Sequence, residues 1–324
     1  MAVDWAQIQQ AEHFLRQHLA LSRLVPASSL TKDVSMPVFL KLESEMPTGS
    51  FKLRGALYAL THQMERGGVT EVVASSTGNH GAAVAYAAKR LGTRATIFLP
   101  RNANPVKRHR IQELGATLIE QGEDISDACE AAVQYSQRTG ALFLNDASDP
   151  NVPAGAATIG TEIVSQLSEV GTVWVPIGDT ALIRGIASAV KHLRRGARII
   201  GVQAEQAPAY YLSWKSGQTK PTETCKTIAD GLATRTPLPE NVAAIRELVD
   251  DVRLVSEAEM LKAVGLLLLN EHVLAEPSGA ASTAAWLSAD KTEQIGPAVL
   301  VVSGSNISEE VLKRAICSQE DRSS

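Results

Sequence analysis

The chain has 324 residues, of which 44% are hydrophobic and 20% charged, with a formal net charge of −4 and a pI near 6.0. These values are typical of a globular protein and argue against a nucleic-acid partner. The start of the chain lacks the basic segment and apolar run of a secretory signal, and the longest apolar run, at 263–270, is far too short to span a bilayer. We therefore expect a cytoplasmic protein with no membrane partner.

The three cysteines are Cys129, Cys225 and Cys317, which are widely separated and odd in number. No CxxC or Cys/His spacing accompanies them. This pattern supports neither a disulfide framework nor a zinc site, so we expect reduced thiols.

Short apolar runs alternate with helical patterns along the chain. After an initial helix from Ile8 to Leu19, the expected strands lie at 37–43, 71–76, 94–100, 116–121, 141–146, 171–178, 198–205 and 297–304. Apolar spacing predicts helices between them, at about 79–91, 105–115, 123–138, 158–167 and 181–193. This alternation predicts an α/β protein with mostly parallel sheets, and the number of units favours two sheets over one. Because no long Pro/Gly linker separates two halves, we expect the two domains to be interwoven.

A further helix is predicted in the stretch "MPTGSFKLRGALYAL", with Ser50 as its N-cap. Lys52 lies in its first turn, at the unfavourable end of the helix dipole, and its helical neighbours are Gly55, Ala56 and Ala59. These small residues leave room for a ligand beside the amine. No carboxylate is close in sequence, so we expect a lowered pKa and a Schiff-base nucleophile, with a solvated surface lysine as the alternative.

Three other strand ends carry polar or glycine residues, which read "SSTGNHG" at 75–81, "GDTA" at 178–181 and "SGSN" at 303–306. Ligands bind at the carboxyl ends of strands in open α/β sheets. The first junction suits a carboxylate, and the backbone N–H groups of the second suit a phosphate, with a hydroxyl from Thr180. Asp179 would repel a phosphate, so we expect it to point away and cap the helix. Ordinary caps and turns are the alternatives at each place.

Several common enzyme motifs are missing from the sequence. It has no GK[ST] phosphate loop, no nicotinamide fingerprint with a following acidic residue, and no GxSxG or HExxH. The pieces "PTGSFKLRGA", "SSTGNHG", "NDASDPNVPAGAATIGTEI", "TIADGLA", "AEPSGAA" and "SGSN" together resemble fold-type II pyridoxal-phosphate (PLP) enzymes, most closely the serine/threonine dehydratase group that includes serine racemase. The resemblance implies a tryptophan synthase β-like fold of two interwoven three-layer domains. The large, PLP-binding domain would comprise 1–45 and 150–324, and the small domain 46–149.

The same resemblance implies a set of site residues. Lys52 would form the Schiff base with the cofactor and act in catalysis together with Thr77. The cofactor would also be bound by Asn79, Gly178, Asp179, Thr180, Ala181, Leu182, Gly231 and Ser303, and the substrate by Ser76, Thr77, Gly78, Asn79 and His80. Because Ser303 offers the ring nitrogen a neutral hydroxyl, the ring would be a weaker electron sink, which favours loss of a β-leaving group.

Three features depart from the family pattern. The turn "GDTA" replaces a run of four glycines, which puts phosphate binding or substrate range in question. Thr77 stands where serine racemase has a serine, and its β-branch restricts the hydroxyl. Gln203 and Ala209 stand where some relatives have the carboxylates of a divalent-cation site, so we expect no metal there.

The expected function is a PLP-dependent dehydratase that converts a β-hydroxy-α-amino acid to a 2-oxo acid and ammonia. Threonine or serine is the family's usual substrate; phenylserine is an option, and 3-hydroxyaspartate ranks below it. A racemase on the same scaffold and a non-catalytic ligand-binding relative are the alternatives. The family implies a homo-oligomer, either a dimer or a tetramer.

Overall fold

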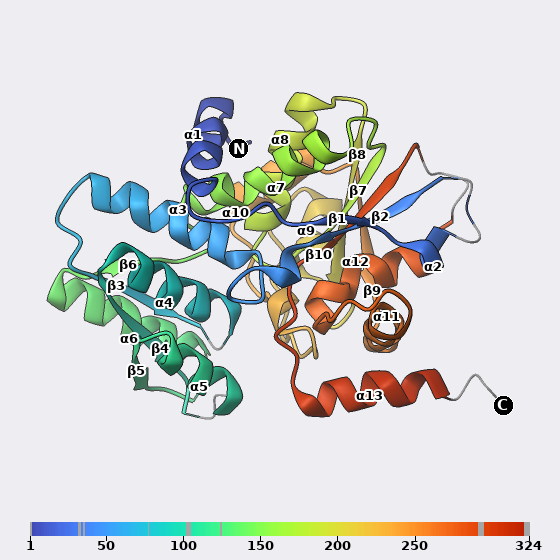
Figure 1. Cartoon of the computed structure of the whole chain (residues 1–324). Coiled ribbons are helices and arrows are strands. Elements are labelled where there is room, and N and C mark those ends of the chain that lie inside the picture. The colour runs from blue at the N-terminus through green and yellow to red at the C-terminus, as the bar shows by residue number, and fades with distance from the viewer. Residues whose placement is uncertain are drawn as a thin grey trace.

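The computed structural model describes residues 2–31, 34, 36–76, 78–101, 105–123, 125–290 and 295–320. Its strands form two sheets, which confirms the expected α/β architecture (Figure 1). The six-stranded sheet has the order β1-β2-β10-β7-β8-β9, and the four-stranded sheet has the order β5-β4-β3-β6. Among these pairs the strands run parallel, apart from β1 against β2.

The two sheets draw on different parts of the chain. The six-stranded sheet contains β1 (Leu24–Pro26), β2 (Val38–Leu42), β7 (Thr172–Pro176), β8 (Arg198–Ala204), β9 (Asp251–Val255) and β10 (Ala298–Val302). The four-stranded sheet contains β3 (Glu71–Ser75), β4 (Arg94–Leu99), β5 (Thr117–Glu120) and β6 (Leu142–Phe143). The chain therefore leaves the larger sheet, builds the smaller one and returns, as the interwoven arrangement predicts. The residue limits proposed for the two domains remain a prediction.

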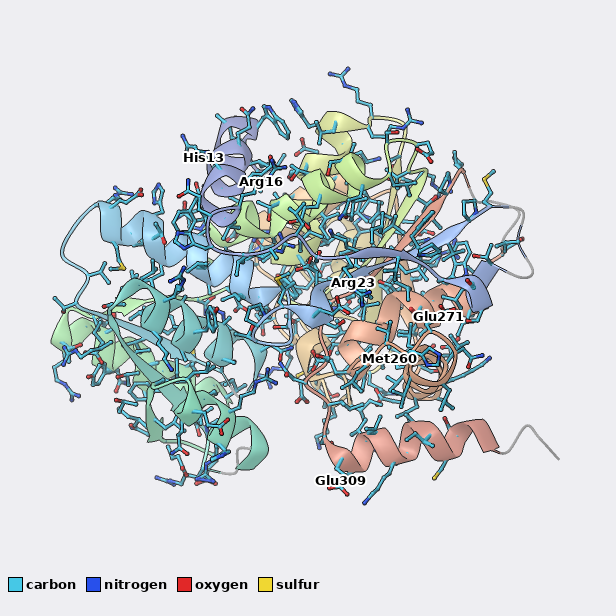
Figure 2. All side chains as sticks on the ribbon, viewed as in Figure 1. His13, Arg16, Arg23, Met260, Glu271 and Glu309 are labelled. Carbon is cyan, nitrogen blue, oxygen red and sulfur yellow. The ribbon has the colours of Figure 1, made fainter. Side chains whose placement is uncertain are left out.

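Helices cover both sheets. They are α1 (Trp5–Leu15), α2 (Ser28–Thr31), α3 (Lys52–Glu65), α4 (Asn79–Leu91), α5 (Pro105–Glu113), α6 (Ile125–Thr139), α7 (Val152–Gln166), α8 (Ala181–Leu193), α9 (Ala209–Ser216), α10 (Pro239–Leu248), α11 (Glu257–Asn270), α12 (Pro277–Ser288) and α13 (Glu309–Glu320), with short 3-10 turns η1 (Glu43–Glu45) and η2 (Asp230–Leu232). In the described parts of the chain, no helix is both long and apolar enough to cross a membrane. Figure 2 shows exposed polar side chains on and beside the outer helices, such as His13 on α1, Arg16 directly after α1 and Glu309 on α13.

Alternating side chains of the central strands build a core on each face of the large sheet. On β10, Leu300 and Val302 pack with α11 and α12, whereas Val299 and Val301 face the cluster formed with α7, α8 and α10. Strand geometry requires this alternation, because successive side chains point to opposite faces. A strand that is covered on both faces has a continuous apolar sequence, as β10 does with "AVLVV".

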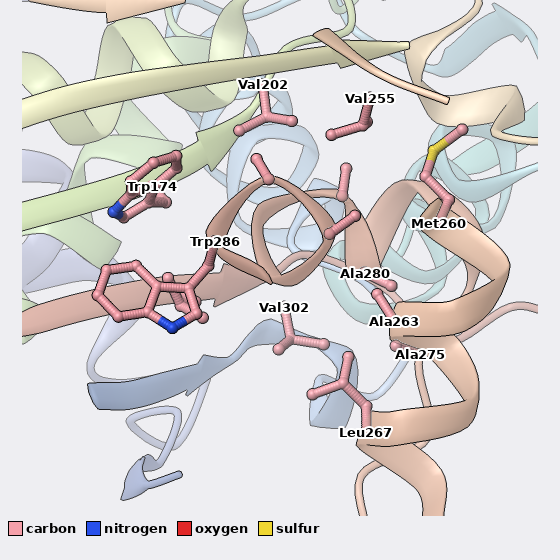
Figure 3. Close-up of a cluster of buried hydrophobic side chains, with 14 of the residues drawn as sticks. Trp174, Val202, Val255, Met260, Ala263, Leu267, Ala275, Ala280, Trp286 and Val302 are labelled. Carbon is pink, nitrogen blue, oxygen red and sulfur yellow. The ribbon is translucent and has the colours of Figure 1, made fainter. Parts of the chain in front are cut away.

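Two tryptophans fill the middle of the first of these cores. Trp174 of β7 and Trp286 of α12 have ring centroids 5.9 Å apart in an edge-to-face arrangement (Figure 3). Both rings are almost fully buried. This contact fixes α12 against β7, and α12 begins beside the candidate site described below.

A buried network of charges fixes α3, the helix that starts at Lys52. Arg54 donates to Glu43 from Nε at 2.8 Å and to Glu162 of α7 from Nη1 at 2.5 Å. The amine of Lys41 donates to the same Glu162 at 2.6 Å. All four side chains are at most 4% exposed. Lys52 therefore sits two residues from a buried anchor that joins α3 to α7 and to the end of β2.

The close contact between α3 and α7 depends on glycine. A Cβ on Gly155 of α7 would lie 2.4 Å from the carbonyl oxygen of Arg54, nearer than any real Cβ contact. We expect Gly155→Ala to push the two helices apart and to lower the free energy of unfolding by about 1–3 kcal/mol, measured by urea denaturation. Gly196→Ala is the control, because its added Cβ meets no atom within 4 Å and should change stability by less than about 0.5 kcal/mol. Equal effects of both variants would contradict this account of the contact.

Candidate active site

A cleft of about 700 Å³ opens above the carboxyl ends of strands from both sheets. Lys52 at the start of α3, the loop after β3, Asp146 after β6 and Asp179 after β7 line its inner part. The segment from Glu223 to Thr236 lines much of the rest. The cleft thus lies where the strand-end rule predicts a ligand site.

A second, smaller cavity of about 30 Å³ adjoins the cleft and shares Lys52 with it. Its wall contains Phe51, Gly178, Asp179, Thr180, Ala181, Leu182, Gly231, Ser278 and Ser303, among others. Every cofactor-binding residue named from the resemblance lines this cavity, Asn79 and Lys52 included. Four strand ends that are far apart in sequence therefore meet at one place. Their individual binding roles remain predictions.

The residues expected around a substrate carboxylate lie on the cleft wall beside Lys52. Ser76, Gly78, Asn79 and His80 all line it, and the hydroxyl of Ser76 accepts from the N–H of Gly78 at 3.2 Å. The buried ring of His80 is tied through Nε2 to the carbonyl of Leu144 at 2.9 Å. Thr77, the expected partner of Lys52 in catalysis, lies outside the described residues.

The turn before α8 is built to receive an anion. Thr180 has a φ of +71°, a left-handed conformation unusual for a β-branched residue, and its buried hydroxyl has no hydrogen-bond partner. No side chain caps the N–H groups in the first turn of α8. A Cβ on Gly178 would lie 2.1 Å from the carbonyl oxygen of Gly231, so only glycine fits there. An orphaned hydroxyl at a helix N-terminus suits the phosphate of PLP, and the residues fit this cofactor.

Asp179 does not cap α8, contrary to one of our expectations. Its carboxylate accepts instead from the hydroxyl of Thr234 at 3.0 Å. Burial raises the pKa of the Asp179 carboxyl, and the negative charge of Asp146 raises it further. Asp179 therefore leaves the N–H groups at the start of α8 without a side-chain cap.

The expected lowering of the Lys52 pKa is wrong. Burial by itself does lower it, but the carboxylates of Asp146, Asp179 and Glu276 raise it by more, and Asp146 also accepts a hydrogen bond from the amine. None of the three is close to Lys52 in sequence, so the residues around Lys52 in the chain give no sign of them. The N-cap predicted for α3 also differs from the observed one. Phe51, and not Ser50, is the N-cap residue, and no side chain caps the start of the helix.

A chain of amide and carboxylate groups runs along the site and was missed from the sequence. Asn79 donates to Glu276 at 2.6 Å, and its own oxygen accepts from Asn306 at 2.5 Å. Asn306 also accepts from Arg110 of α5 and donates to the carbonyl of Thr48 at 3.0 Å. Both Glu276 and Asn306 stood within the motifs "AEPSGAA" and "SGSN", so their position was available as a signal.

The residues at the place of the relatives' cation site are not metal ligands of the usual kind. Gln203 is buried and its oxygen accepts from the N–H of Tyr211 at 2.9 Å, and Ala209 begins α9. Among the described residues no group of three His, Cys, Asp or Glu side chains could hold a metal ion. The absence of an obligatory metal stays a prediction.

Comparisons with known proteins identify the family of this chain. A family model described as pyridoxal-phosphate dependent enzyme matches residues 15–304. The chain is 36% identical to an L-threonine ammonia-lyase of Geobacter sulfurreducens over 94% of its own length and 76% of the relative's. It is 37% identical to the catabolic L-threonine dehydratase of Escherichia coli, over 83% of each chain.

The fold of this chain is also similar to the folds of solved structures. The fold is similar to that of maize serine racemase, with a TM-score of 0.91 at 28% identity, covering 100% of this chain and 99% of that one. It is also similar to the threonine deaminase of Solanum lycopersicum in its processed form (isoform 2), with a TM-score of 0.90 at 26% identity, covering 99% and 90%. The expected cofactor and the expected tryptophan synthase β-like fold are thereby confirmed. The chain belongs to the family of pyridoxal-phosphate dependent enzymes.

Proposed function

We propose that this enzyme is a PLP-dependent ammonia-lyase that dehydrates a β-hydroxy-α-amino acid, with L-threonine as the first substrate to test. One observation carries the proposal. Lys52 lines both the cleft of about 700 Å³ and the small cavity beside it, so one residue borders the space assigned to the substrate and the space assigned to the cofactor. The L-threonine ammonia-lyases among the relatives support the choice of reaction.

Each part of the site is assigned a role. The first turn of α8, with Gly178 and Thr180, holds the cofactor's phosphate, and Ser303 contacts its ring nitrogen. Ser76 and Asn79 bind the substrate carboxylate at the start of α4, where the helix dipole favours an anion. The substrate's Cα–H bond then points towards Lys52.

Lys52 takes the proton from Cα, and the β-hydroxyl takes up a proton as it leaves, so that the elements of one water molecule are lost. The bound cofactor supplies the electron sink for the pair left at Cα. Taken over the whole reaction, the amino acid loses water across Cα and Cβ and then loses ammonia by hydrolysis, which yields the 2-oxo acid. Walls from both sheets hold the reacting atoms in one orientation, which is the protein's own contribution to the rate.

The test is an absorption spectrum of the purified protein, followed by L-threonine, L-serine and L-threo-phenylserine in the same cuvette with detection of 2-oxo acid. We expect a cofactor band that borohydride abolishes by fixing the cofactor to Lys52, and 2-oxo acid from at least one substrate. Faster formation of the enantiomer than of 2-oxo acid would instead favour a racemase. Absence of any band after addition of PLP would overturn the proposal.

The Thr180 hydroxyl makes a separate prediction about cofactor affinity. Thr180→Gly removes the unpartnered hydroxyl but relieves the left-handed strain, whereas Thr180→Ser keeps the hydroxyl. We expect the glycine variant to raise the Kd for PLP about 5- to 10-fold, which corresponds to one lost hydrogen bond, with the serine variant near the wild type. Titration of the cofactor-free protein measures both. Tighter binding by the glycine variant would contradict a role of this hydroxyl in holding the phosphate.

The working form of the enzyme is the last part of the proposal. We assign it to the cytoplasm as a homodimer or homotetramer, on the strength of the family resemblance. Sedimentation velocity of the loaded protein tests the oligomeric state, and a monomer at micromolar concentration would refute it.

A further inference from the structure

An ion pair joins the amine of Lys52 to a residue that the reaction described above does not use. The carboxylate of Asp146, in the loop after β6, accepts from the Lys52 amine. The same carboxylate oxygen lies 3.8 Å from Nδ1 of His80. The Asp146 and Lys52 side chains are only 14% and 16% exposed, so solvent screens the pair weakly. Both also line the cleft that the proposed function assigns to the substrate.

The charged surroundings single out this carboxylate. Asp179 after β7 and Glu276 before α12 also act on the charge of Lys52, and Asp146 accepts a hydrogen bond from its amine. From α6, the thiol of Cys129 faces Asp146, and its pKa is raised by burial and then by nearby negative charge. Burial alone would raise the pKa of Asp146, but His80 and Lys52 lower it by more. The pair is therefore ionised at neutral pH.

We propose that Asp146 is a positioning residue for Lys52: its carboxylate holds and orients the free amine, and stabilises the ammonium ion that forms when this amine takes the proton from Cα. The inference rests on the proposed function only in taking Lys52 as the base. The proton passes from Cα to Nζ, and the electron pair of the C–H bond stays with the carbon and the cofactor. Asp146 gains and loses no proton; its charge acts because a carboxylate in hydrogen-bond contact stabilises a cation that forms beside it.

The first test uses the full chain with its cofactor removed. Trinitrobenzenesulfonate reacts with neutral amines, so its rate at Lys52, followed by peptide mass spectrometry from pH 7 to 11, reports the charge state of that lysine. We expect Asp146→Asn to move the midpoint of this profile down by at least about one pH unit, which is about tenfold faster labelling at pH 8. Glu223→Gln is the matched control, since Glu223 lines the same cleft with an exposed side chain, and its profile should match the wild type.

The second test uses the loaded enzyme. Asp146→Asn should lower kcat about 10- to 100-fold with KM within about threefold, because the carboxylate acts on proton transfer and not on substrate binding. Asp146→Glu keeps the charge, so it should retain the wild-type labelling midpoint and recover part of kcat. These two readouts separate positioning from a purely structural role.

Two results would overturn the proposal. One is a folded Asp146→Asn protein whose Lys52 labelling profile is unchanged, which would leave Asp179 and Glu276 in control of the amine. The other, decisive even if Asp146→Asn does not fold, is a midpoint that falls by a full unit in Asp146→Glu. Failure of the proposed function can be told apart from failure of this inference. In that case borohydride would fix no cofactor to Lys52, whatever the labelling profile.

Discussion

Replacing Lys52 with alanine is expected to abolish turnover, with kcat reduced by at least about 10³–10⁴-fold. The variant loses both the amine that forms the Schiff base and the base that takes the Cα proton, and no other lysine in the described residues lines the small cavity. Formation of 2-oxo acid from L-threonine measures the loss. Borohydride should no longer fix the cofactor to the protein. Lys215→Ala, on the exposed side of α9, is the control and should leave turnover within about threefold.

The same variant should still fold, but with an altered response to acid. In the wild type the pKa of Asp146 is lowered, so its pairing contributes stability above the ordinary aspartate pKa and that contribution is lost as the pH falls below it. Without Lys52 this carboxylate loses its contacting cation. We expect the Lys52→Ala protein to be less stable than the wild type at pH 7 and to approach it only as the pH falls well below the ordinary aspartate pKa, measured by thermal unfolding. Wild-type turnover by the Lys52→Ala protein would contradict the assignment of Lys52 as the Schiff-base lysine and the catalytic base.

The strand ends were the part of the site that could be read from the sequence. Ser76, Gly178 and Ser303 each follow an apolar run, and parallel strands bring their carboxyl ends to one edge, so local pattern predicts where these residues gather. Asp146 follows a strand in the same way, after "ALFL", but its strand is only two residues long in the structure and its sequence carries no glycine or helix start to mark the turn.

The direction of the Lys52 pKa shift could not be predicted from the local sequence pattern. It depends on carboxylates that are 94, 127 and 224 positions away in the chain, at Asp146, Asp179 and Glu276. Only the fold sets their distances from the amine. Strand β9 was missed for a related reason: it lies at the edge of the sheet, where Arg253 is exposed, so its sequence "DVRLV" lacks the continuous apolar run of the central strands.

Arg54→Met is expected to lower the free energy of unfolding by about 3–5 kcal/mol, because it removes the ion-pair partner of Glu43 and leaves Glu162 paired with Lys41 alone. Burial by itself lowers the pKa of Arg54, but the two carboxylates raise it by more, so the guanidinium is a permanent charge of this core. A loss of this size is a large share of the roughly 5–15 kcal/mol that holds a protein folded. Urea denaturation measures it, provided that a single cooperative transition is seen.

Arg23→Met is the matched control. Arg23 also pairs with a glutamate, Glu45, but the two side chains are 64% and 42% exposed, so we expect a loss below about 1 kcal/mol. Similar losses in both variants would show that burial of the Arg54 network does not matter.

The Arg54 network links the fold to the chemistry. Arg54 donates hydrogen bonds to Glu162 and Thr158 of α7, and Lys52 lies on the same first turn of α3. Arg54→Lys keeps the charge but cannot supply the guanidinium's forked set of donors, so α3 should be held less firmly even where the protein still folds. We therefore expect this variant to lose kcat with little change in the Kd for PLP at the turn before α8. Wild-type kcat in a destabilised Arg54→Lys protein would show that the position of Lys52 is fixed by its own contacts and not by the buried anchor two residues away.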